Sequence, residues 1–179
     1  DTLLEAHQLH VPHIFEADLA QGFILLSDLG STAYLDKLNT DTADQLYSDA
    51  MDALFILQTR VPHDKLPPYD EVLLNREMSL FRDWFLQTHL DLKLDEDAET
   101  ILAGTFRFLT ENALAQPKVF VHRDYHSRNL MVTGSNNPGI LDFQDAANGP
   151  VTYDLVSLLR DCYIAWPDSR VYSWVEAYH

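Results

Sequence analysis

The sequence predicts an α+β fold that is mostly helical and includes a short β-hairpin. Three observations lead to this fold class. The chain opens with two strand-like apolar runs, continues with three stretches of helically spaced apolar residues, and changes after Pro117 to short apolar runs between turn residues. Its 179 residues are enough for one ordinary domain or for one lobe of a larger protein.

The opening segment predicts two strands around a turn. The strand-like runs occupy residues 12–18 and 22–27, and the turn between them ends at Gly22. Residues 2–6 have the character of the last turns of a helix. The run Asp28-Leu29-Gly30-Ser31 then breaks the strand pattern, so we expect a connection there.

Three helices are expected before Pro117. The first ends at Val61-Pro62 and has an apolar face of Leu46, Ala50, Leu54 and Leu57. The second extends from about residue 70 to residue 90, with a core-facing stripe of Leu74, Met78, Phe81 and Phe85. The third opens on three acids at residues 95–97, where the helix dipole favours them. It is expected to direct inward Ala98, Ile101, Leu102, Thr105 and Leu109.

The last third of the chain predicts short strands around polar loops. Residues 119–121 are a buried strand, residues 122–129 a polar loop, and residues 130–132 and 140–143 two strands joined by the turn-rich segment 134–139. A helix is expected from Tyr153 to Tyr163. A final helical stripe consists of Val171, Trp174, Val175 and Tyr178.

Composition excludes several classes of function. The 12 Lys and Arg residues against 28 Asp and Glu residues give a formal net charge of −16, which argues against nucleic-acid binding and against an anionic membrane surface. The single Cys162 excludes an internal disulfide framework, and no apolar run is long enough to span a membrane. We predict a cytoplasmic protein without nucleic-acid or membrane partners, and its oligomeric state stays open.

Both ends of the chain indicate a longer protein. The chain begins at Asp1 without an initiator methionine, and it stops at His179 inside the last helical stripe. We therefore expect truncation at both ends.

Residues 119–161 contain the chemically informative pattern. The polar loop presents Asp124 and then Asn129, and Asp142 ends the second strand of the predicted hairpin. Phosphoryl transfer from ATP needs a carboxylate that orients the acceptor hydroxyl and takes its proton, and oxygen ligands that hold Mg²⁺. Asp124 suits the first role. Asn129 and Asp142 suit the second, because a hairpin returns its two ends side by side.

The same residues carry a resemblance to a known family. The loop from His122 to Asn129 resembles the H-x-D-x-x-x-x-N catalytic loop of protein kinases and aminoglycoside phosphotransferases. The segment Leu141-Asp142-Phe143-Gln144-Asp145 is similar to the metal-binding I-D-x-x-D segment of the phosphotransferases, and no Ala-Pro-Glu signature of protein kinases follows it. The resemblance implies a protein-kinase-like fold: residues 1–28 would be the end of the N-terminal β lobe, and 29–179 the helical C-terminal lobe. It also implies ATP and Mg²⁺ as cofactors.

One branch of the family resembles more of the chain. Residues 22–30, 73–85 and 151–163 are similar to the bacterial cell-wall-recycling kinases of N-acetylmuramate and N-acetylglucosamine. This resemblance implies a transferase that moves the γ-phosphate of ATP to the anomeric hydroxyl of an amino sugar in peptidoglycan recycling. The family also uses a phosphate-covering loop and a lysine–glutamate pair, which its pattern places before Asp1. If the chain acts alone, we therefore expect weak ATP binding and little turnover.

Further residues are expected at the edges of the site. Ser27, Asp28 and Leu29 follow an apolar strand and are expected to bind the nucleotide through their backbone; the alternative is an ordinary turn. His122 and Asp154 are expected to support the loop structurally, the second from the start of a helix. Candidate substrate-binding residues are Arg76, Glu77, Trp84, Asp145 and Arg160. For the helical members of this set, the alternative is a solvated face with weak near-neighbour ion pairs.

Three other interpretations stay open. An aminoglycoside, choline or homoserine phosphotransferase would use the same catalytic residues, and the negative charge would suit a cationic acceptor. A noncatalytic nucleotide-binding module is less favoured, because Asp124, Asn129 and Asp142 are all present. Zinc held by His122, Asp124 and His126 lacks a further ligand at a suitable spacing.

Overall fold

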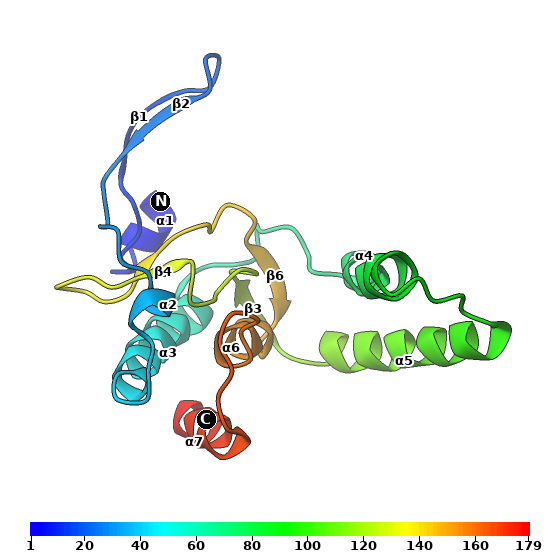
Figure 1. Cartoon of the computed structure of the whole chain (residues 1–179). Helices are drawn as coiled ribbons and strands as arrows, with labels where there is room; N and C mark the ends of the chain where they lie inside the picture. Colours follow the sequence, from blue (N-terminus) through cyan, green and yellow to red (C-terminus); the bar gives the residue numbers. More distant parts are fainter.

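The computed structural model describes residues 1–179 and shows a central body with two projections (Figure 1). One projection is a hairpin of β1 (Ile14–Asp18) and β2 (Phe23–Leu26). The other, called the helical arm below, consists of α4 (Glu71–Leu80), its π-helical continuation η1 (Phe81–His89) and α5 (Glu96–Leu114). The predicted α+β class is thereby confirmed.

The N-terminal hairpin has the predicted strands and turn. Antiparallel pairing runs from Ile14–Leu26 to Asp18–Phe23, and the turn closes on Gly22, whose φ of +77° is in the region that favours glycine. Short helix α1 (Thr2–Glu5) precedes it, and its first N–H is capped by Asp1. Every residue of β2 is exposed, so the apolar strand is present but unburied.

Helix α3 (Ala43–Arg60) lies at the centre of the core. Its predicted apolar face of Leu46, Ala50, Leu54 and Leu57 is buried, which confirms that prediction. The helix contacts β3 (Lys118–Val121), α6 (Tyr153–Leu159) and α7 (Asp168–Tyr178). Short helix α2 (Tyr34–Lys37) precedes it, with Tyr34 fully buried.

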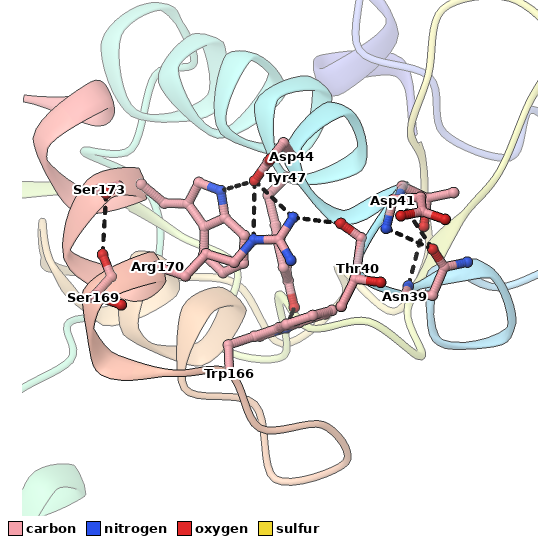
Figure 2. Close-up of polar contacts among 11 residues, drawn as sticks. Asn39, Thr40, Asp41, Asp44, Tyr47, Trp166, Ser169, Arg170 and Ser173 are labelled. Carbon is pink, nitrogen blue, oxygen red and sulfur yellow. Dashed lines mark hydrogen bonds and ion pairs between the residues drawn. The ribbon is translucent and has the colours of Figure 1, made fainter.

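Helix α7 is fastened to the start of α3 by an aromatic and charged cluster (Figure 2). The Arg170 guanidinium lies 5.0 Å from the ring centre of Trp166 and 5.2 Å from that of Trp174, and its Nη2 is 3.0 Å from Asp44 Oδ1. The indole N–H of Trp166 donates to the buried Tyr47 hydroxyl at 2.9 Å. Val171 and Trp174 are buried as the stripe predicts, whereas Val175 is exposed.

Two small antiparallel strand pairs carry the polar loops. β4 (Leu130–Met131) pairs with β5 (Gly139–Ile140), which confirms the predicted hairpin. β3 pairs with β6 (Ala147–Pro150), a strand that the sequence did not predict, because Gly149-Pro150 is typical of a turn. Gly149 is needed there, since a Cβ atom would lie 2.8 Å from the Cβ of Tyr69.

Helix α6 ends at Leu159, earlier than the predicted Tyr163. The chain turns away after Arg160, and the Asp161 carboxylate accepts the N–H of Tyr163 at 2.9 Å. A turn closed by the Asp161 side chain therefore follows the helix in place of further helical turns.

The helical arm has the predicted helices but not their predicted burial. Phe81 and Phe85 are each 46% exposed, Ile101 is 69% exposed, and Thr110 is the only buried residue of α5. Leu74, Met78, Ala98 and Leu102 are half-buried, but the other residues of the two stripes are exposed, so their assignment to a buried face is wrong. Helices α4 and α5 contact each other but stand away from the body (Figure 1).

No helix of the structure has both the length and the apolar character needed to cross a membrane.

Candidate active site

The start of the polar loop between β3 and β4 is hydrogen-bonded to one carboxylate, that of Asp154. The N–H of His122 donates to Asp154 Oδ2 at 2.7 Å, and the N–H of Arg123 donates to Asp154 Oδ1 at 3.0 Å. Both His122 and Asp154 are fully buried. Burial raises the pKa of Asp154 to about 7 against the lowering effect of these two donors, and burial lowers the pKa of His122 to about 4. Burial therefore favours the neutral form of the His122 imidazole at pH 7.

The amide of Asn129 joins the two segments that carry the candidate carboxylates. Its Nδ2 donates to the backbone oxygen of Asp124 at 3.0 Å and to Asp142 Oδ2 at 3.3 Å. The structure therefore brings Asn129 and Asp142 side by side, at the open edge where Asp142 is exposed. Carboxylate and amide carbonyl oxygens are hard donors of the kind that Mg²⁺ prefers, so these two side chains fit that ion.

Two residues of the site have left-handed backbone. Arg123 has φ of 78° and Asp142 has φ of 64°. Such a conformation costs a non-glycine residue about 1–3 kcal/mol and persists where the surroundings determine it. Here the surroundings are the Asp154 carboxylate on one side and the Asn129 amide on the other.

The connection after β2 lies against the same hairpin. Two hydrogen bonds join Ser27 to His13. The Ser27 N–H donates to the His13 carbonyl at 2.8 Å, and the His13 N–H donates to Ser27 Oγ at 2.8 Å. Asp28 Oδ1 accepts the N–H of Gly30 at 2.8 Å. A Cβ atom at Gly139 would lie 2.9 Å from Leu29 Cδ1, so Leu29 packs directly on the start of β5.

The comparison with protein families decides the class of this chain. A profile of the phosphotransferase enzyme family matches residues 1–179. The chain belongs to the phosphotransferase enzyme family.

Curated relatives within this family are N-acetylmuramate/N-acetylglucosamine kinases. The one from Pseudomonas putida is 48% identical over 179 residues, which covers 99% of this chain and 52% of that protein. The one from Pseudomonas aeruginosa is 47% identical over 176 residues, with 98% and 52% covered. The one from Neisseria meningitidis is 40% identical over 174 residues, with 95% and 52% covered. The chain spans about half the length of the curated relatives it matches.

Solved structures of distant sequence share the fold. The choline kinase LicA from Streptococcus pneumoniae gives a TM-score of 0.70 at 12% identity, covering 99% of this chain and 59% of that chain. The ADP-bound aminoglycoside phosphotransferase APH(2'')-Ib gives a TM-score of 0.68 at 18% identity, with 99% and 63% covered. The predicted protein-kinase-like fold is confirmed.

The candidate substrate residues are scattered. Glu77 contacts the polar loop between β3 and β4: its Oε1 pairs with Arg123 Nη2 at 2.8 Å, and its Oε2 accepts a hydrogen bond from the Tyr69 hydroxyl. Arg76 and Trp84 are exposed on the arm. Two more candidates lie outside the arm, namely Asp145 and Arg160. Asp145 is exposed beyond Asp142, whereas Arg160 Nη1 pairs with Asp168 Oδ1 at 2.8 Å, on the side of α7.

The zinc interpretation is not supported by the geometry. Asp1, Glu5 and His13 form a group whose ligand atoms lie within 4.8 Å of one another, whereas His122, Asp124 and His126 form no such group. His122 lies edge-on to Tyr125 and His126 edge-on to Tyr163.

Two contacts of the polar loop are not predictable from the sequence. Glu77, a candidate substrate residue, forms an ion pair with Arg123. Asp161 accepts the N–H of the buried Ser127. The sequence holds no signal for the second contact, because its partners are separated by β4, β5, β6 and α6.

Proposed function

We propose that this chain is the catalytic part of an ATP-dependent kinase that phosphorylates the anomeric hydroxyl of N-acetylmuramate or N-acetylglucosamine. The observation that carries the proposal is the 48% identity to a kinase of that name across nearly the whole chain. The pathway served would be peptidoglycan recycling in the cytoplasm, where ATP is available.

In this reaction Asp124 is the general base. Its carboxylate accepts the proton of the acceptor hydroxyl while that oxygen bonds to the γ-phosphorus, and ADP leaves with the electrons of the broken phosphorus–oxygen bond. The loop geometry supports this role: Asp124 follows two residues whose N–H groups are fixed by Asp154, so its position is determined before substrate binds.

The nucleotide side of the site uses two further groups of residues. Asn129 and Asp142 would hold Mg²⁺, which when bound neutralises charge on the phosphate oxygens. Ser27, Asp28 and Leu29 would meet the adenine, and the packing of Leu29 on Gly139 supports a nucleotide position between the connection and the β4–β5 hairpin.

The acidic acceptor needs a local cation, because the chain carries a net charge of −16. Arg76 is the better candidate for the lactyl carboxylate of N-acetylmuramate, since it is exposed and its guanidinium forms no ion pair. Arg160 is already paired with Asp168. Trp84, 65% exposed, is available to stack on a pyranose ring.

The test is phosphorus NMR on the complete gene product with Mg-ATP and four acceptors: N-acetylmuramate, N-acetylglucosamine, an aminoglycoside and choline. We expect an anomeric sugar-phosphate signal that falls by about 10²–10⁴ in rate in Asp124→Asn. Arg76→Ala should raise KM for N-acetylmuramate more than for N-acetylglucosamine, because only the first bears a lactyl carboxylate. Phosphate that appears only on the aminoglycoside or choline would refute the substrate assignment but keep Asp124.

A further inference from the structure

The segment after α6 contacts the polar loop between the candidate base and the candidate metal ligand. Ser127, which lies between Asp124 and Asn129, is fully buried. Its N–H donates to Asp161 Oδ2 at 3.0 Å, and its hydroxyl donates to the same oxygen. The other carboxylate oxygen accepts the N–H of Tyr163.

The two neighbours of Ser127 contact the same segment. The His126 ring lies edge-on to Tyr163 at 5.5 Å between ring centres, and the Arg128 guanidinium lies 4.7 Å from the centre of the same ring. Each of residues 126–128 therefore contacts either Asp161 or Tyr163. We call this pair the loop clamp.

The loop clamp is itself fixed to the core. The Ser127 carbonyl also accepts the N–H of Leu35 in α2 at 3.0 Å, so Ser127 is bonded to α2 as well as to Asp161. The segment that carries the clamp ends at Trp166, which bonds to Tyr47 of α3 and stacks on Arg170 (Figure 2). Because the segment is held to the core at Trp166, we expect Asp161 and Tyr163 to fix the position of residues 126–128.

We propose that Asp161 is a positioning residue of the phosphotransferase: through Ser127 it fixes the spacing between Asp124 and Asn129. This proposal rests on the proposed function. The turn between those residues also has internal hydrogen bonds: the His126 N–H donates to the Asp124 carbonyl at 3.1 Å, the Asn129 N–H to the His126 carbonyl at 3.0 Å, and Asn129 Nδ2 to the Asp124 carbonyl at 3.0 Å. Without the Asp161 carboxylate, two donors of a buried serine lose their acceptor, and residues 126–128 rearrange to find another.

The test compares Asp161→Ala, Asp161→Asn, Ser127→Ala and the double variant Ser127→Ala/Asp161→Ala in the complete gene product. Glu176→Ala is the matched control, since it removes one acid from the neighbouring exposed surface of α7 without breaking a side-chain bond. The readouts are kcat, KM for ATP, the Mg²⁺ concentration at half-maximal rate and the thermal midpoint.

For Asp161→Ala we expect a loss of about 10- to 100-fold in kcat and a several-fold higher Mg²⁺ requirement, with KM for ATP within about twofold. Asp161→Asn keeps one acceptor oxygen and should recover part of kcat. The double variant should lose no more than Asp161→Ala alone, because the hydroxyl bond that Ser127→Ala removes is already absent when the Asp161 carboxylate is gone. Unchanged kcat and Mg²⁺ dependence in folded Asp161→Ala, or losses that multiply in the double variant, would overturn the proposal.

Two further outcomes are decided by other readouts. If Asp161→Ala does not fold, Ser127→Ala decides, since it removes only the hydroxyl bond: a higher Mg²⁺ requirement supports the clamp and an unchanged one refutes it. If the wild-type protein phosphorylates no acceptor, the proposed function fails. Amide hydrogen exchange then tests the clamp: faster exchange at Ser127 and Asn129 in Asp161→Ala supports it, and equal exchange overturns it.

Discussion

The buried Asp154 carboxylate predicts an unusual dependence of stability on pH. Its pKa is raised from 3.8 to about 7, mainly by burial. Between these values the unfolded chain has lost the proton of Asp154 while the folded chain still holds it. The folded state therefore binds more protons, and its stability falls as pH rises from about 4 to about 7. Each pKa unit corresponds to about 1.4 kcal/mol, so the full loss is about 4 kcal/mol.

The Asp154→Asn variant isolates this effect, because an amide of the same shape does not titrate. We would measure the free energy of unfolding in urea for both proteins from pH 4 to pH 8. The difference, wild type minus Asp154→Asn, should fall by about 4 kcal/mol up to pH 7 and stay constant above it. All other titrating groups are common to both proteins and cancel. A difference that rises with pH would show that the N–H donors of His122 and Arg123 outweigh burial, and a flat difference would show no shift at all.

Three further predictions concern packing and can be measured by the same urea titrations. Leu54→Ala, at a fully buried position of α3, should lower the free energy of unfolding by about 2–5 kcal/mol, and a loss below 1 kcal/mol would contradict the core assignment. Gly149→Ala should lower the free energy of unfolding by about 1–3 kcal/mol, because the new Cβ atom collides with Tyr69. Gly104→Ala is the contrasting case: its new Cβ atom in α5 has no atom within 4 Å, so the free energy of unfolding should rise by about 0.5–1 kcal/mol. Arg170→Lys keeps the charge but not the flat stack on two indoles and should cost about 1 kcal/mol, so an unchanged midpoint would refute the role of stacking.

The elements with a strong local pattern are predictable from the sequence. The four-residue stripe of α3, the turn at Gly22 and the β4–β5 hairpin are all present, because spacing and turn chemistry act over a few residues. Asn129 and Asp142 meet for the same reason, because the β4–β5 hairpin between them brings its two ends side by side.

Burial and distant pairing are not predictable in this way. Periodicity identifies an apolar face on the arm but not what covers it, so Phe81 and Phe85 were wrongly assigned to the core. Strand β6 has no strand-like composition, and it is a strand because its backbone pairs with that of β3. The contact of Asp161 with Ser127 depends on the path of the whole intervening chain, which no local pattern encodes.

The pairing of β3 with β6 has a consequence for engineering. Its last rung joins Val121 to Ala147, immediately before His122 and immediately after Ala146. Asp124, Asn129 and Asp142 therefore all belong to one excursion of the chain that leaves and returns through a single rung of a β-ladder. A chimera with a relative would therefore exchange all three residues through two junctions that are neighbours in the β-ladder, and it would leave the helical arm unchanged.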